Sequence, residues 1–136
     1  MVPLLLVVAL QSPAPEPAPP VPKPAHMVVM PQNPDLTNPA RMWANCAGMF
    51  VVVAAKIAKP DEAPLWGARS RQALAQARVV KNTENLSAEQ INVVALYGAS
   101  GFNKERQESA EKQAVFDRAL RQCQTLLATL PKPPGG

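Results

Sequence analysis

Apolar residues recur at intervals of three and four positions along most of the chain between residues 38 and 130. This is the spacing of one face of an α-helix. No stretch alternates apolar and polar residues for long enough to predict a strand. Prolines, glycines and polar clusters divide the pattern into four segments. The sequence therefore predicts an all-α fold of four helices.

The first predicted helix is the most apolar of the four. Asn38 followed by Pro39 is a typical start, because the amide side chain caps free N–H groups and proline fits the first turn. Pro60 ends the pattern, so we expect the helix to reach about Ala58. Its uninterrupted apolar run is too short to span a membrane. The stripe expected to face the core is Trp43, Cys46, Ala47, Phe50, Val53, Ala54 and Ile57.

The second predicted helix begins near Asp61 or Glu62 and ends near Lys81. Mostly small side chains face the core from this helix, which permits a close approach between helices. They are Trp66, Ala73, Ala77 and Val80.

The third predicted helix begins at a capping box formed by Ser87 and Gln90. Residues 91–97 are apolar nearly all round, which indicates burial. Gly98 and Gly101 are expected to end this helix. The third helix should therefore be short and buried.

The fourth predicted helix is capped by Asn103 and runs to Leu130, before Pro131. Its first half is polar. The apolar seam expected along it is Phe116, Ala119, Leu120, Cys123, Leu127 and Leu130.

Four helices with short joins pack most simply as an up-down-up-down antiparallel four-helix bundle. Cys46 lies seven residues after Pro39, and Cys123 lies seven before Leu130. Antiparallel packing of the first and last helices would bring the two cysteines to one level, which predicts a disulfide. On the chain-entropy model such a bond stabilises a fold by about 4 to 5 kcal/mol. The alternative is a pair of buried thiols in a cytosolic protein.

The N-terminal residues 1–11 are interpreted as a signal peptide. The apolar run Val2–Leu10 has the length of a signal-peptide core and about half that of a membrane span. Two features are atypical: no Lys or Arg precedes the run, and the cleavage site before Ser12 is imperfect. A buried N-terminal segment or a mistaken start codon are the alternatives. We expect a periplasmic or secreted bacterial protein.

Residues 12–35 are interpreted as a disordered, proline-rich linker. Seven of the twelve residues from Pro13 to Pro24 are proline, a composition that favours the extended polyproline II form. The helical domain is expected to cover residues 36–130, followed by a disordered tail at 131–136.

Catalytic chemistry is not indicated. The chain has one histidine, His26, which excludes sites that need two. His26 follows the linker and is interpreted as solvated. The carboxylates of Glu105, Glu108 and Glu111 alternate with cations, as on a solvated helix face. No phosphate-binding glycine loop, CxxC motif or calcium loop is present. We expect no enzyme activity, no catalytic residues, no metal and no cofactor.

The charge distribution points to an anionic partner. The net charge is +4, and the segment from Ala63 to Thr83 contains no acidic residue. Helical spacing places three of its four cations within about a quarter turn. This basic strip would suit an anionic lipid, an acidic polymer or an acidic envelope protein. The alternative is a solvating face that happens to be basic. The strip consists of Arg69, Arg71, Arg78 and Lys81.

The sequence favours a non-catalytic, exported helical module of the bacterial cell envelope that binds a protein partner or an anionic surface. If Met42 and Met49 were exposed together, they would further indicate a partner or a homodimer. The alternative is a cytosolic nucleic-acid-binding protein, because residues 86–106 loosely match a helix-turn-helix. An exported protein would not meet the chromosome, so nucleic acid is not expected as a partner.

Overall fold

The computed structural model describes residues 28–131, which form four α-helices and no strand. The all-α prediction is therefore confirmed for this part of the chain. The predicted signal peptide at 1–11, the linker up to residue 27 with His26, and residues 132–136 of the tail lie outside the described residues. The helices are α2 (Pro39–Val52), α3 (Ala63–Ala77), α4 (Ala88–Glu105) and α5 (Ala110–Ala128), and the π-helical segment η1 (Val53–Ile57) continues α2.

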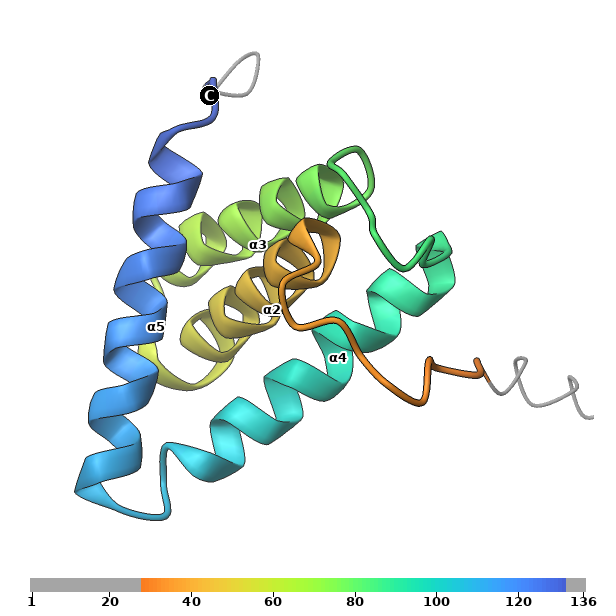
Figure 1. Cartoon of the computed structure of the whole chain (residues 1–136). Coiled ribbons are helices and arrows are strands. Elements are labelled where there is room, and N and C mark those ends of the chain that lie inside the picture. Colours follow the sequence, from red (N-terminus) through yellow and green to blue (C-terminus); the bar gives the residue numbers. More distant parts are fainter. Residues whose placement is uncertain (1–27, 132–136) are drawn as a thin grey trace, which may run out of the picture.

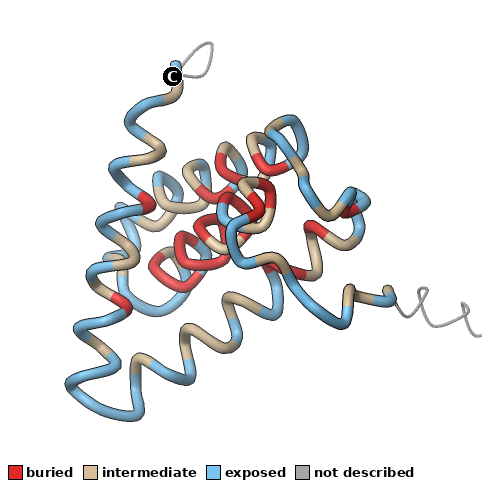
Figure 2. Tube along the Cα trace, in the orientation of Figure 1, coloured by how far each residue is buried: buried red, intermediate tan, exposed pale blue. Residues whose placement is uncertain are grey.

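Helix α2 is the centre of the fold, and α3 and α4 pack along it (Figure 1). Helix α2 contributes more buried residues than any other helix, as Figure 2 shows. The stretch Pro39–Ile57 is long and apolar enough to cross a membrane by length and composition alone, yet 56% of that window is buried in the fold. Met49 is buried and only Met42 is exposed, so these two methionines do not form the exposed face that would indicate a partner.

The contact between α2 and α4 depends on glycine. A Cβ atom on Gly48 would lie 2.6 Å from the carbonyl oxygen of Ala95 and 3.0 Å from the amide nitrogen of Ala99. Real Cβ atoms do not approach backbone atoms this closely, so the two helix backbones can meet here only because Gly48 has no side chain. On the α4 side, a Cβ on Gly98 would lie 3.3 Å from Oδ1 of Asn45.

Helix α4 extends beyond its predicted end. The capping box of Ser87 and Gln90 is confirmed. The prediction that Gly98 and Gly101 end the helix was wrong, because α4 continues through both to Glu105. Packing of Gly98 against α2 offsets the low helix propensity of glycine.

The second half of the predicted burial pattern of α4 also differs from the structure. Leu96 and Tyr97 are exposed, although they belong to the segment expected to be buried all round. Only Ile91, Val94 and Ala95 of this helix are buried, since α4 presents one face to α2 and another to solvent. The apolar residues on the outer face therefore do not contribute to the core.

Helix α5 begins at Ser109, whose side chain accepts a hydrogen bond from the amide of Lys112. The predicted cap, Asn103, was wrong. Its Oδ1 instead accepts hydrogen bonds from Nε of Arg106 and Nε2 of Gln107 near the end of α4. Asn103 thus lies within α4 and cannot start the next helix.

The up-down-up-down bundle is not confirmed. Helix α3 runs opposite to α2, α4 packs on α2 in roughly the same direction, and α5 runs across them in Figure 1. A crossing helix contacts each neighbour over a short length, and α5 accordingly buries only Phe116 and Cys123. The fold is thus three helices arranged around α2 with a fourth lying across them.

The N-terminal end of α2 is held by a polar cluster. The N-cap prediction for Asn38 is confirmed: its Oδ1 accepts a hydrogen bond from the amide of Ala40. The same oxygen accepts from the amide of Thr83, and Nδ2 donates to Asn82 and Glu84. This fully buried side chain therefore joins the start of α2 to the loop between α3 and α4.

Residues before the predicted domain boundary also contact the helices. Nε2 of Gln90 donates to the carbonyl oxygen of Val29, and Oγ1 of Thr83 donates to Asp35. Met30 packs against the core. The described part of the predicted linker, residues 28–35, thus adheres to the helical domain.

Candidate functional site

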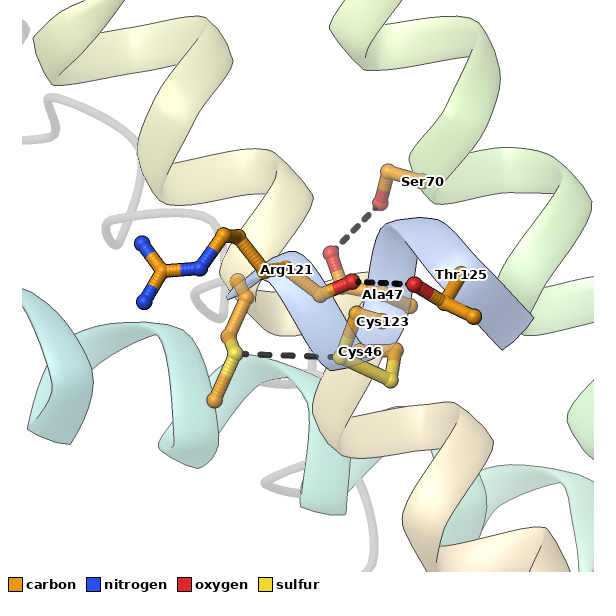
Figure 3. The surroundings of a disulfide bond; sticks show 7 residues. Cys46, Ala47, Ser70, Arg121, Cys123 and Thr125 are labelled. Atoms are coloured by element: carbon orange, nitrogen blue, oxygen red, sulfur yellow. Dashed lines mark hydrogen bonds between the residues drawn. A yellow bond between two sulfur atoms is a disulfide. The ribbon is translucent and has the colours of Figure 1, made fainter. Parts of the chain in front are cut away.

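The predicted disulfide is present. Cys46 of α2 and Cys123 of α5 are bonded across a sequence separation of 77, with their Cα atoms 5.4 Å apart (Figure 3). Both residues are buried, and the Cys123 sulfur lies 3.8 Å from Sδ of Met49. A disulfide of this kind is compatible with an oxidising compartment.

At the same level, α2 is also attached to α3. Oγ of Ser70 donates a 2.8 Å hydrogen bond to the carbonyl oxygen of Ala47, the residue after Cys46 (Figure 3). The small side chains of Ala73 and Ala77 are fully buried at this interface, as the sequence predicted. Helix α3 is thus held on one side of α2 and α5 on another. The side of α3 that faces away from α2 is exposed to solvent.

Two cations of the basic strip lie on this solvent-facing side of α3. Arg71 and Arg78 are exposed and are two helical turns apart, so they project in similar directions. Within residues 28–131 the salt bridges are Arg41 with Glu84 and Lys112 with Glu108, and neither involves a residue of the strip. Arg78 donates from Nη2 to Oδ1 of Asn92, which is a neutral partner. Neither guanidinium group is therefore paired with a carboxylate of residues 28–131.

The other two cations of the strip are placed differently. The guanidinium carbon of Arg69 lies 4.4 Å from the centroid of the Trp66 ring, and Arg69 is half-buried by this cation–π contact. Helix α3 ends at Ala77, four residues before the predicted end, so Lys81 follows the helix. Helical spacing therefore no longer places Lys81 beside Arg71, although its side chain is exposed.

Exposed apolar residues accompany the two arginines, and they were not part of the predicted basic strip. Leu65 is 54% exposed and Val79 is 76% exposed. Ala68 and Ala75 are exposed between them. These four residues are spaced along one side of the helix, opposite the core-facing alanines. Their helical spacing is a sequence feature from which this exposed apolar side could have been recognised. The exposed face of α3 therefore combines apolar and cationic side chains, and we call Leu65, Ala68, Arg71, Ala75, Arg78 and Val79 the α3 face.

A pocket of about 300 Å³ lies between the end of α4 and the start of α5. Met49, Phe102 and Phe116 contribute apolar surface to it. Glu105, Arg106 and Lys112 add charges of both signs to its lining, so the pocket favours neither an anionic nor a cationic ligand. Its size lies at the lower end of the range for small-molecule sites.

The polar cluster at the start of α2 is structural in character. The ion pair with Arg41 and the hydrogen bond from Asn38 lower the pKa of Glu84 to about 2. Every buried side-chain nitrogen and oxygen among the described residues has a hydrogen-bond partner. A cluster with all its groups satisfied internally has none left to bind a ligand. In the same part of the chain, no group of three or more potential metal ligands comes together.

The helix-turn-helix interpretation of residues 86–106 requires a correction. Ala88–Glu105 is one continuous helix, so the expected turn at Gly98 and Gly101 is absent. The nucleic-acid-binding alternative loses the motif on which it was based.

Comparison of the chain with protein-family models, with curated proteins and with solved structures found no match. The function is therefore inferred from the geometry and charge of the chain itself.

Proposed function

We propose that this protein is an exported, non-catalytic helical module that binds an anionic partner through the α3 face. The observation that carries the proposal is the pair Arg71 and Arg78, which are exposed and have no carboxylate partner among residues 28–131. Surface cations that have no carboxylate nearby attract anionic partners over about one Debye length, which is roughly 8 Å at physiological ionic strength.

The surrounding charges support this assignment. No acidic residue occurs between Ala63 and Thr83, and the whole chain has a net charge of +4. The next carboxylate along the chain, Glu84, is neutralised by its ion pair with Arg41. Asp61 and Glu62 lie at the N-terminal end of α3, away from Arg78, so the potential around Arg71 and Arg78 is positive. Guanidinium groups are weakly hydrated and lose little hydration on contact with an anionic surface.

Export is the second part of the proposal. The disulfide supports it, because such bonds persist in the periplasm and outside the cell. The apolar run Val2–Leu10 supports it from the sequence. The proline-rich segment that follows the apolar run would then act as a spacer that holds the helical domain away from a surface.

Sedimentation with anionic probes tests the proposal. The full chain is mixed with phosphatidylglycerol vesicles or with dextran sulfate, over a range of salt concentrations. We expect salt-sensitive binding to at least one probe, and R71E/R78E should weaken it by at least about tenfold, since each cation near an anionic surface contributes about 1 kcal/mol.

The matched control is R118E/R121E, which makes the same change of net charge at two exposed arginines of α5. It should retain most of the affinity. Binding that R71E/R78E leaves unchanged, or that both variants weaken equally, would contradict a specific role of the α3 face. Absence of binding to both probes would contradict the proposed function as a whole.

A further inference from the structure

We infer that the anionic partner is a phospholipid membrane, on which α3 lies flat with Leu65 and Val79 in contact with lipid and Arg71 and Arg78 among the headgroups. This inference rests on the proposed function and names the partner of the same site. It depends on the arrangement of apolar and cationic side chains within the α3 face.

The cationic and the apolar side chains occupy different sides of the α3 face. At about 100° per residue, Arg71 and Arg78 project within about 20° of each other along one edge. Ala68 and Ala75 follow, and Val79 and Leu65 come next around the helix axis. Val79 keeps nearly helical geometry although it follows α3, because its amide donates to the carbonyl oxygen of Gln76. The face thus has a cationic edge and an apolar side.

The C-terminal end of the described chain contacts the apolar side of the face at Gln72, which projects between Val79 and Leu65. Nε2 of Gln72 donates to the carbonyl oxygen of Pro131, and Gln72 is half-buried. Leu65 and Val79 lie one each side of this contact along the helix and remain more than half exposed. Pro131, which is itself exposed and apolar, lies between them, so a lipid surface on this side would meet Leu65, Pro131 and Val79 together.

A membrane accounts for this arrangement better than an acidic polymer does. A hydrated polymer would satisfy the two arginines and leave Leu65 and Val79 in water. A bilayer interface accepts apolar side chains below its headgroups and pairs cations with its phosphates. The long aliphatic stems of Arg71 and Arg78 let their guanidinium groups reach the phosphates while the helix axis lies at the boundary. Cations and apolar residues then stabilise the same bound state.

The experiment compares a variant that removes only the apolar contribution with one that removes only charge. L65Q/V79Q keeps both arginines, and its two substitutions are at exposed positions. Sedimentation is measured with phosphatidylglycerol vesicles, phosphatidylcholine vesicles and dextran sulfate. We expect binding to phosphatidylglycerol vesicles alone among the vesicles, weakened about tenfold or more by L65Q/V79Q, because partial burial of two aliphatic side chains contributes about 1.5 kcal/mol or more.

The control L96Q/Y97Q removes an exposed apolar pair from α4 and should leave vesicle binding unchanged. Circular dichroism establishes that each variant is folded. Binding to dextran sulfate that equals binding to the anionic vesicles, with no effect of L65Q/V79Q, would overturn the membrane assignment and leave the proposed function intact. Loss of all anionic binding in the unaltered chain would overturn both.

Discussion

Arg41 and Glu84, which are 43 positions apart in the chain, form a two-pronged ion pair in which Nε and Nη2 donate to the two carboxylate oxygens at 2.9 and 2.8 Å. Both side chains are largely buried. Asn38 adds a hydrogen bond from the N-terminal end of α2 to the same carboxylate. The pair therefore fastens the loop between α3 and α4 to the central helix.

Acid should destabilise the fold through this pair. Hydrogen bonding with Arg41 lowers the pKa of Glu84 in the folded protein from 4.5 to about 2. The ionised carboxylate therefore stabilises the folded state fully above about pH 4.5, and this stabilisation is lost as the pH falls toward 2. Hydrogen bonds from Thr37 and Thr83 lower the pKa of Asp35, which acts in the same direction.

The variant E84Q separates the contribution of Glu84. At neutral pH it should reduce the free energy of unfolding by about 3 kcal/mol or more, because it leaves the Arg41 charge without its partner. Urea denaturation between pH 2 and 7 should show a shallower acid dependence for E84Q than for the unaltered chain. Parallel curves would show that Glu84 does not carry the acid sensitivity.

Gly48 should be the least replaceable glycine among the described helices. In G48A the new methyl group would collide with backbone atoms of Ala95 and Ala99, so α2 and α4 must separate. We expect a loss of about 1 to 3 kcal/mol, as for other overpacked sites. The matched variant G101A meets nothing within 4 Å and should instead stabilise α4 by about 0.5 to 1 kcal/mol. Thermal denaturation of both variants measures the difference, and equal effects would show that the close helix approach is not required.

Reduction should loosen α5 before the other helices. The disulfide contributes about 4 to 5 kcal/mol on the chain-entropy model for a separation of 77 residues. Few buried residues of α5 remain to hold it once the bond is broken. Hydrogen exchange should therefore rise in Ala110–Ala128 on reduction, with a smaller rise in α2 and α4. Uniform acceleration across all helices would indicate that α5 is an integral part of one cooperative unit.

Local features of the fold could be predicted from the sequence. The cap at Asn38 and the capping box at Ser87 follow from neighbouring residues, and the pairing of the cysteines follows from the presence of two on the apolar faces of two helices. The end of α4 could not be predicted in this way. Gly98 is a helix-ending residue by propensity, whereas the close packing of Gly48 of α2 against Ala95 and Ala99 favours a helix that continues through Gly98.

The arrangement of α5 and the composition of the candidate site depend on long-range contacts. A disulfide fixes one point of α5 and leaves its direction free, so pairing of Cys46 with Cys123 is compatible with both an antiparallel and a crossing helix. The exposed fractions of Leu65 and Val79 follow from which side of α3 faces α2. Arg69 is half-buried because its guanidinium group packs on the Trp66 ring. The spacing of residues in the sequence identified Arg71 and Arg78 but not the exposed apolar residues of the α3 face beside them.

The most direct test is the thiol content of the protein recovered from its native host. Cell fractions are treated with an alkylating reagent before any reduction, and the intact mass is measured with and without subsequent reduction and alkylation. Protein from the exported fraction should gain no alkyl group at first and two after reduction, at Cys46 and Cys123. Recovery of the chain from the cytosolic fraction with both thiols free would contradict the exported, disulfide-closed module described above.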